Sequence, residues 1–275
     1  MTERCNTKYP ILLVHGVGLR DRKYLNYWGR IPNALVREGA IIYYGNQDSL
    51  GSVEYNGTVL KKNIEELLAE TGCEKVNIIA HSKGGLEARY MISSLRMSGK
   101  VASLTTVATP HHGSKTVGLF LKLPKFFFKV AAFFANNITG RCLGDKNPDF
   151  YAVSHHLASE HLAEFNARNP DSDSVYYQSY GAMMRNAFSD IIFFWSHIII
   201  YLVEGKNDGI VSLESSKWTN YKGVLRGATN RGVSHADVID VRRWNVKIKT
   251  PDNGAVSDIL DMYIAIVSDL KRMGY

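Results

Sequence analysis

The sequence of 275 residues predicts an α/β fold, a mostly parallel central sheet with helices on both of its faces. Short apolar runs bounded by turn residues indicate buried strands, and longer segments with apolar residues three and four positions apart indicate helices. The two kinds of segment alternate along the chain, which is typical of parallel strands joined by helices. With 45% hydrophobic residues, the chain can bury the core of a single domain covering residues 1–275.

Short apolar runs mark the predicted strands. Turn residues flank most of them, and many of their residues are β-branched or aromatic, as expected of strands buried on both faces. The runs occupy residues 9–14, 40–44, 76–80, 104–108, 175–177 and 200–203. Helical spacing of apolar residues is clearest at 60–68 and at 259–270.

One segment interrupts the alternation of strands and helices. Residues 117–139 are rich in phenylalanine with three lysines among them, and the chain then becomes polar and irregular up to residue 172. We expect a helical lid or cap insertion at about residues 115–172, whose apolar face covers a site in water and swings out at a lipid interface. The alternative is that these phenylalanines are ordinary buried helix faces.

The run at 76–80 leads into a sharp serine turn, AHSKGG at residues 80–85, followed by helix-forming residues. A strand, a serine at the apex of a tight turn and a helix form a nucleophile elbow, which exposes the serine hydroxyl. Ala80 and Gly84 supply the small side chains that such a tight turn needs on each side of the serine. Ser82 is therefore the candidate nucleophile.

A serine hydroxyl needs a base to take its proton and an acid to orient that base. In folds with this elbow the partners follow in the order serine, acid, histidine. Asp208 follows the apolar run ending at Val203, and His235 lies in a glycine-containing loop close to the C-terminal helical pattern. We take these two as the acid and the base, with Glu204, still inside the predicted strand, as the alternative acid.

The other histidines after the elbow fit a catalytic role less well. His197 lies within an apolar run and is interpreted as a core or helix histidine. The polar part of the predicted cap contains three more, which are interpreted as surface residues: His155, His156 and His161.

Stabilising a tetrahedral intermediate requires two donors aimed at its oxyanion. Typical donors are the backbone N–H after the nucleophile and one from the loop after an early strand. These correspond to Lys83 and Val17, with Gly16 allowing close backbone approach. The hole does not need the Lys83 ammonium, which is interpreted as solvated or ion-paired.

Composition argues against several other classes of protein, namely those that bind nucleic acid, bind a metal through cysteines or span a membrane. The formal charge of +7 favours acidic lipid surfaces, but no Lys/Arg run exceeds two residues, so we expect no nucleic-acid partner. The three cysteines lack metal-binding spacing and are predicted to be free thiols. The longest apolar run, 191–203, is too short to span a bilayer.

The N-terminal residues contain no apolar stretch long enough for a Sec signal peptide. Three locations are consistent with this sequence: the cytoplasm, export by a route other than Sec, or secretion after trimming of a leader. The oligomeric state is left open by the sequence.

Taken together, these segments resemble the bacterial true lipases, the α/β-hydrolase family that includes the Pseudomonas, Burkholderia and Proteus triacylglycerol lipases. The matching segments occur in the family's order. They are YPILLVHG at 9–16, YWGRIP at 27–32, AHSKGGL at 80–86, TPHHGS at 109–114, NDGIVS at 207–212 and SHAD at 234–237. The resemblance implies an α/β-hydrolase fold, a Ser82, Asp208 and His235 triad, an oxyanion hole at Val17 and Lys83, and a helical lid in the aromatic insertion.

The resemblance also implies a structural calcium ion. In those lipases one ligand is an aspartate two residues after the catalytic histidine, which matches Asp237, and another precedes the catalytic aspartate, which Asp190 approximates. Val241 stands where the family has a glutamine. The alternative is that Asp237 only caps a helix. The disulfide of some relatives has no counterpart.

We therefore expect a serine carboxylester hydrolase that cleaves medium- or long-chain acylglycerols at a lipid–water interface through an acyl-enzyme, without a cofactor for its chemistry. A short-chain esterase or a phospholipase with the same triad is the alternative among enzymes. A catalytically silent protein that binds lipid or a partner is the alternative from another class.

Overall fold

The structure is a computed structural model that describes residues 3–21, 26–122, 125–142, 144–249 and 255–275. Its strands form one sheet in the order β2-β1-β3-β4-β5-β6-β7-β8, with the first six parallel and the last two antiparallel. Their bounds are β1 Ile11–Val14, β2 Ile42–Tyr44, β3 Val76–His81, β4 Val101–Val107, β5 Tyr176–Met183, β6 Tyr221–Gly227, β7 Lys247–Lys249 and β8 Val256–Asp258. The predicted mostly parallel sheet is confirmed.

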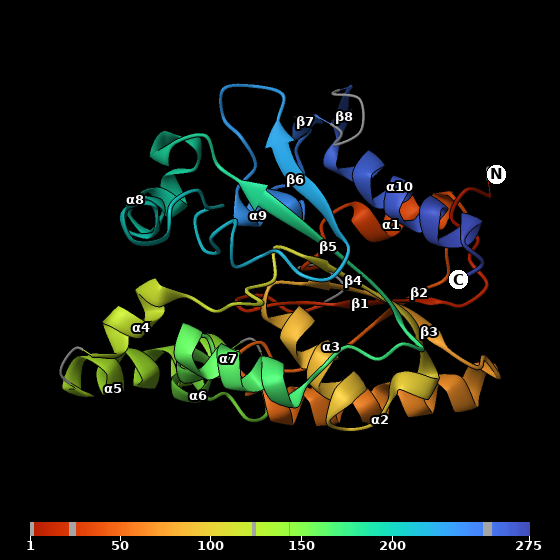
Figure 1. Ribbon diagram of the computed structural model, residues 1–275, viewed down its shortest axis with the longest axis horizontal. Helices are drawn as coiled ribbons and strands as arrows, with labels where there is room; N and C mark the ends of the chain where they lie inside the picture. Colours follow the sequence, from red (N-terminus) through yellow and green to blue (C-terminus); the bar gives the residue numbers. More distant parts are fainter. Residues whose placement is uncertain (1–2, 22–25, 123–124, 143, 250–254) are drawn as a thin grey trace.

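Helices cover both faces of this sheet (Figure 1). α2 (Val53–Thr71) and α3 (Lys83–Ser93) lie on one face, and α1 (Ile31–Arg37) and α10 (Ile259–Arg272) lie on the other. Successive side chains of a strand point to opposite faces. In β1, Leu12 and Val14 accordingly join the apolar cluster under α2 and α3, whereas Ile11 and Leu13 join the cluster that includes α10.

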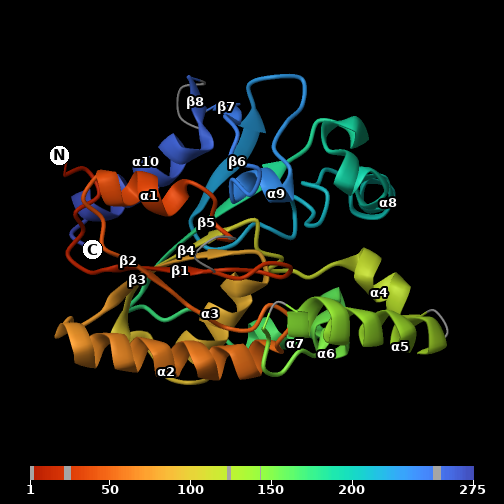
Figure 2. The same ribbon diagram turned by 180° about the vertical axis from the view of Figure 1, so that it is seen from behind.

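The long connection between β4 and β5 is helical. It contains α4 (Lys115–Leu121), α5 (Lys125–Phe134), a π-helical stretch (Ala135–Gly140), α6 (Phe150–His156) and α7 (Ser159–Arg168). These helices gather beyond the carboxyl ends of the parallel strands (Figure 2). We call residues 115–172 the cap insertion. Its second half was expected to be irregular, but α6 and α7 occupy most of it.

One predicted strand is wrong. Residues 200–203 belong to a helix, α8 (Phe194–Glu204), which lies beside the cap insertion at the same end of the sheet (Figure 1). A short apolar run fits a buried strand and an apolar helix equally well, so the run at 200–203 could not distinguish them. The strands β6, β7 and β8 were not predicted because their polar residues obscure the pattern; β6 is mostly half-buried.

A buried ion pair fixes the start of α3. Lys83 and Glu87 lie one turn apart and their side chains are almost fully buried, with Lys83 Nζ bonded to the Glu87 carboxylate. Lys83 Nζ also donates to the Gly51 carbonyl at 2.8 Å, and Asn56 Nδ2 donates to Glu87 Oε1 at 2.7 Å. Burial raises the pKa of Glu87, opposed by Lys83 and Asn56. The loop before α2 is thereby tied to α3.

We expect Glu87→Gln to lower the free energy of unfolding by about 3–5 kcal/mol, because it leaves a buried ammonium without a counter-charge. The double variant Lys83→Met, Glu87→Leu should recover most of that loss, since it removes both charges. Urea denaturation measures both. Glu65→Gln, which breaks the exposed Lys61–Glu65 pair on α2, is the matched control and should cost less than about 1 kcal/mol. A Glu87→Gln variant as stable as this control would contradict the prediction.

Candidate active site

Ser82 lies at a strained turn between β3 and α3. Its backbone angles are φ 54° and ψ −132°, a left-handed conformation that a residue with a side chain adopts only when its surroundings impose it. Close packing imposes it here. A Cβ built on Gly84 would lie 2.5 Å from the His15 carbonyl oxygen, and one built on Gly16 would lie 2.7 Å from Ser82 Cβ. Only glycine fits at either position, so the loop after β1 presses against the serine.

Asp208 and His235 meet although 26 residues separate them in the sequence. His235 Nδ1 lies 2.7 Å from Asp208 Oδ2, and the His235 backbone N–H donates to the Asp208 carbonyl at 2.8 Å. The other carboxylate oxygen of Asp208 accepts from the N–H groups of Ile210 and Val211, at 2.9 and 2.8 Å. Asp208 is buried, so these bonds hold its carboxylate in one orientation toward the imidazole.

The position of Asp208 in the fold differs from the expectation. It follows α8 in a loop and is not at the end of a strand, because residues 200–203 are helical. The Asn207 carbonyl accepts from Met184 N at 2.9 Å, which returns this loop to the carboxyl end of β5. The alternative acid, Glu204, has another partner: it accepts from Ser114 Oγ at 2.7 Å and from Thr116 N at 2.9 Å, and so joins α8 to the start of α4.

His235 lies against the elbow itself. Its ring and that of His81, the residue before Ser82, are tilted 44° with centroids 4.4 Å apart. His81 Nδ1 in turn lies 2.7 Å from the Tyr27 hydroxyl. Burial, and next the nearby His235, lower the pKa of His81 well below its ordinary value, so the His81 ring is neutral near pH 7. Sequence reasoning missed this contact, although the position of His81 beside Ser82 was a signal.

The loop after β1 is held firmly beside Ser82. His15 Nδ1 lies 2.8 Å from the Gly16 carbonyl oxygen and His15 Nε2 lies 3.0 Å from that of Gln47, and the single N–H of a neutral ring donates to one of the two. Gln47 Nε2 donates back to the His15 carbonyl at 2.8 Å. Burial lowers the pKa of His15 to about 4, so this ring is also neutral near pH 7. Gly18 N donates to Ser49 Oγ at 2.7 Å.

The two expected oxyanion donors are the backbone N–H groups of Val17 and Lys83, and both residues lie next to the serine turn. Val17 follows Gly16 in the loop that presses on Ser82, and Lys83 opens α3, where the first backbone N–H groups of a helix have no partner within the helix. The Lys83 side chain is turned away into its ion pair with Glu87 and is not solvated.

The two aspartates implied as calcium ligands lie together, but arginines accompany them. Arg242 Nη1 donates to Asp237 Oδ1 at 3.0 Å, and Arg242 Nη2 donates to Asp190 Oδ1 at 2.7 Å. Arg231 Nη2 lies within ion-pair distance of both carboxylates. No group of three or more His, Cys, Asp or Glu is arranged to hold a metal in the described part of the chain. The residues present do not fit a calcium ion. Asp237 also belongs to a capping box at α9 (His235–Val238).

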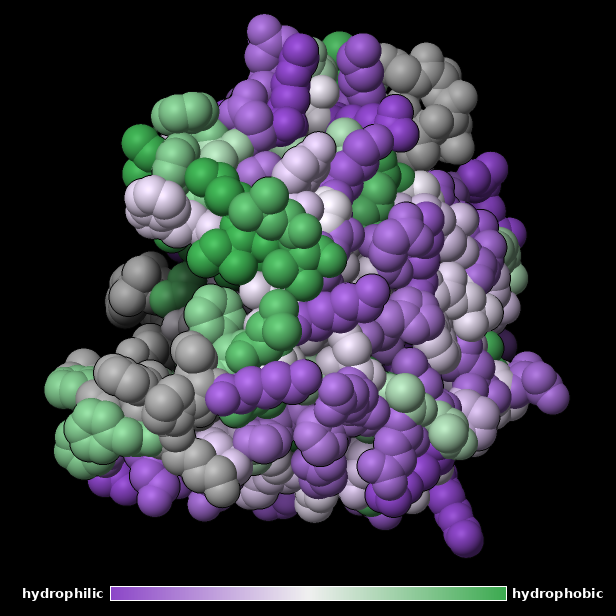
Figure 3. All heavy atoms as spheres, turned by 60° about the vertical axis from the view of Figure 1, so that its left-hand side comes forward, coloured by the Kyte–Doolittle hydropathy of each residue, from purple (hydrophilic) through white to green (hydrophobic). Residues whose placement is uncertain are grey.

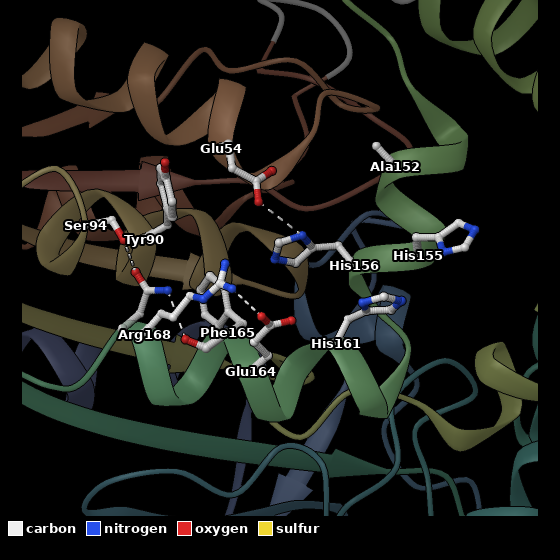
Figure 4. A pocket seen from close by; sticks show the side chains of 11 residues that line it. Glu54, Tyr90, Ser94, Ala152, His155, His156, His161, Glu164, Phe165 and Arg168 are labelled. Carbon is white, nitrogen blue, oxygen red and sulfur yellow. Dashed lines mark hydrogen bonds and ion pairs between the residues drawn. The ribbon is translucent and has the colours of Figure 1, made fainter.

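Four other histidines considered from the sequence lie on α8 and in the cap insertion. His197 is buried on α8, as expected, and burial lowers its pKa. Of the three expected on the surface, His155 and His156 are half-buried and only His161 is exposed. They line a hollow of about 550 Å³ between the cap insertion and α2, where His156 Nδ1 lies 3.4 Å from Glu54 Oε1 (Figure 4). All three cysteines are free, as predicted.

Apolar side chains surround this end of the molecule. Figure 3 shows them gathered over α8 and the neighbouring cap helices. Around α8 the exposed fractions reach 81% for Ile191, 73% for Ile192 and 72% for Trp195. Exposed apolar residues of the cap insertion are Leu119, Phe120, Phe126, Phe133, Phe134 and Tyr151. No described helix combines the length and apolar character that crossing a bilayer requires.

Comparison with known proteins identifies the family. Residues 9–191 match the family described as alpha/beta hydrolase fold. A relative named triacylglycerol lipase 2, from Saccharomyces cerevisiae, is 29% identical over 271 residues, which cover 93% of this chain and 78% of that protein. A Vibrio cholerae triacylglycerol lipase is 41% identical over 114 residues, covering 41% of this chain and 36% of that protein.

Solved structures show the same fold at low sequence identity. Staphylococcus hyicus lipase has a TM-score of 0.65 at 16% identity and covers 98% of this chain and 97% of that chain. The metagenomic carboxyl esterase MGS0156 has a TM-score of 0.69 at 15% identity, with 96% and 76% coverage. The strained serine turn, the acid and histidine beside it and these matches lead to one conclusion: the chain belongs to the α/β-hydrolase fold family, with yeast and bacterial triacylglycerol lipases among its relatives.

Proposed function

We propose that this protein is a serine carboxylester hydrolase, a triacylglycerol lipase that cleaves medium- or long-chain acyl esters through an acyl-enzyme. The observation that carries the proposal is the Asp208–His235 hydrogen bond beside the strained turn of Ser82. These are the three groups that serine hydrolysis requires, in the chain order of this fold. The lipase relatives support the choice of ester.

In the proposed reaction Ser82 Oγ attacks the carbonyl carbon of the ester, and His235 Nε2 takes the hydroxyl proton. Asp208 holds Nδ1–H of the imidazole, which fixes the tautomer and stabilises the imidazolium. The backbone N–H groups of Val17 and Lys83 stabilise the oxyanion. When the intermediate collapses, the C–O bond breaks and His235 returns the proton to the leaving glyceride oxygen. Water, deprotonated by His235, then releases the fatty acid from Ser82.

The exposed apolar surface supports a substrate in a lipid phase. Large apolar side chains of α8 and of the cap insertion face solvent at the end of the sheet where Ser82 lies. Contiguous exposed apolar surface of this kind marks interaction with a partner or a membrane. Helices with such a face bind in the plane of a lipid interface. We propose that the cap insertion acts as a lid that moves when this surface meets lipid.

Two other enzymes would use the same groups, namely an esterase for short soluble esters and a phospholipase. The extent of exposed apolar surface favours a lipid interface over soluble esters. Rates measured across acyl lengths, below and above substrate solubility, separate the esterase from the lipase. A catalytically silent binding protein is not favoured, because binding alone would not require an acid, a base and a strained serine together.

Replacing Ser82 tests whether it is the nucleophile. Ser82→Ala should lower kcat on a p-nitrophenyl ester by about 10⁴–10⁶-fold without unfolding the protein. A fluorophosphonate probe should label the parent protein and not this variant. Ser93→Ala, on the same helix as the elbow, is the matched control and should keep both labelling and activity. Retention of most activity by Ser82→Ala would refute the assignment.

Replacing exposed apolar residues beside α8 tests whether this surface binds lipid. The double variant Ile192→Ser, Trp195→Ser should lower the rate on emulsified triacylglycerol by about tenfold or more, because each change removes apolar area that contacts lipid. Hydrolysis of a soluble short ester should stay within about twofold, since neither residue belongs to the triad.

Ile41→Ser is the matched control, because Ile41 is 59% exposed and precedes β2 at the opposite end of the sheet. Equal losses on both substrates, or unchanged activity on the emulsion, would argue against docking through α8.

A further inference from the structure

Two buried carboxylates flank the loop that carries His235. The side chain of Asp190 is 3% exposed and that of Asp237 is 1% exposed. Asp190 caps the turn that leads into α8, accepting from Ile192 N at 3.2 Å. Asp237 lies on α9 two residues after His235, where its carboxylate accepts from Ser234 N at 3.2 Å. Two like charges buried close together are unfavourable unless cations accompany them.

Arg231 and Arg242 supply the positive charge. The two Nη atoms of Arg242 bridge the carboxylates, with Nη1 3.0 Å from Asp237 Oδ1 and Nη2 2.6 Å from Asp190 Oδ2. Arg231 Nη2 lies 3.4 Å from Asp237 Oδ2 and 3.7 Å from Asp190 Oδ2, and its Nε donates to the Ser189 carbonyl. The planar guanidinium fork suits such bridging of two carboxylates.

Trp244 closes this cluster on its outer side. Its ring centroid lies 4.4 Å from the guanidinium carbon of Arg231 and 5.3 Å from that of Arg242. Trp244 Nε1 also donates to Asp237 Oδ1 at 3.3 Å. Stacking on an aromatic face limits the directions in which each guanidinium can turn. We call these five residues the arginine clamp: Asp190, Arg231, Asp237, Arg242 and Trp244.

The clamp connects the loop of His235 to α8. Arg231 lies four residues before His235, and its backbone carbonyl accepts from Arg185 N at 3.1 Å. Val233 N donates to the Met183 carbonyl at 2.9 Å at the end of β5. The loop is therefore attached to β5 by its backbone and to the entry of α8 by its side chains. Movement of either attachment would shift His235 relative to Ser82.

We propose that Arg231 and Arg242 are positioning residues, which hold His235 in its catalytic orientation and take the place that a calcium ion would need between Asp190 and Asp237. The guanidinium groups use the carboxylate oxygens that calcium would require as ligands. Catalysis and stability are therefore independent of divalent cations. This inference rests on the proposed role of His235 as the base.

The first experiment uses the unaltered protein. Its Tm and its kcat on a soluble p-nitrophenyl ester are measured after EDTA treatment and again after addition of about 5 mM CaCl₂. This concentration would saturate a structural Ca²⁺ site. We expect neither quantity to change. A Tm that rises by several degrees with Ca²⁺, or activity that EDTA abolishes and Ca²⁺ restores, would overturn the proposal.

The second experiment breaks the clamp. Arg242→Gln should lower Tm by about 5 °C or more, because it leaves buried carboxylates short of a partner. Its kcat on the soluble ester should fall by about tenfold with little change in KM, since the base is misplaced while substrate binding remains. Arg242→Lys keeps the charge but loses the fork, so it should restore Tm more fully than kcat.

Arg243→Gln is the matched control, because Arg243 is the next residue and its side chain is exposed. It should keep the parent Tm and kcat. In the double variant Arg231→Gln, Arg242→Gln the two aspartates have lost both guanidinium groups. CaCl₂ should then raise the Tm of this variant, although it leaves the parent unchanged. A double variant whose Tm does not respond would contradict the claim that the arginines occupy the position of a cation.

The outcomes separate this inference from the proposed function. If His235→Ala retains activity, the proposed function is wrong, and the positioning role proposed for Arg231 and Arg242 is then also wrong. If His235→Ala abolishes activity but Arg242→Gln keeps the parent kcat, the proposed function stands and the clamp does not position His235.

Discussion

The close approach of the loop after β1 to the turn after β3 governs the geometry of the site. The left-handed turn at Ser82 and the loop after β1 can approach this closely because Gly16 and Gly84 have no side chains: a Cβ on Gly16 would collide with Ser82, and one on Gly84 with the carbonyl of His15. Parallel pairing of β1 and β3, with Val14 opposite Ala80, brings the two loops together. The relative positions of the serine hydroxyl and the proposed oxyanion donors are therefore determined by the pairing of strands in the core of the sheet.

Residues near that core could be predicted from the sequence, because local patterns determine them. The serine turn follows a buried strand and precedes a helix; β1, β3 and β4 are marked by continuous apolar runs, and α10 by apolar residues three and four positions apart. The Asp208–His235 pair was reached through chain order, and the structure brings the two side chains into contact. The resemblance to bacterial lipases implied calcium at Asp190 and Asp237, but a sequence does not reveal which cations pack against its carboxylates. Arg231 and Arg242 become neighbours only through tertiary folding.

The segment 191–204 shows most plainly why the rest could not be predicted. Its apolar run predicted a strand at residues 200–203, whereas the structure has a short helix with a largely exposed apolar surface. A helix that is apolar on most sides is normally covered. In this protein α8 lies at the end of the sheet where Ser82 and the cap insertion lie, and its last residue, Glu204, bonds to the start of α4. The same helix thus borders the proposed lipid surface, the cap and, through Asp190, the loop of His235.

In the proposed reaction Ser82 carries the acyl group between the two half-reactions. Acid quench of the protein within milliseconds of mixing with a long-chain p-nitrophenyl ester, followed by peptide mass spectrometry, tests it most directly. We expect a burst of p-nitrophenol and an added acyl mass on the peptide containing Ser82. Acylation confined to a different residue, or turnover with Ser82 replaced by alanine, would contradict it.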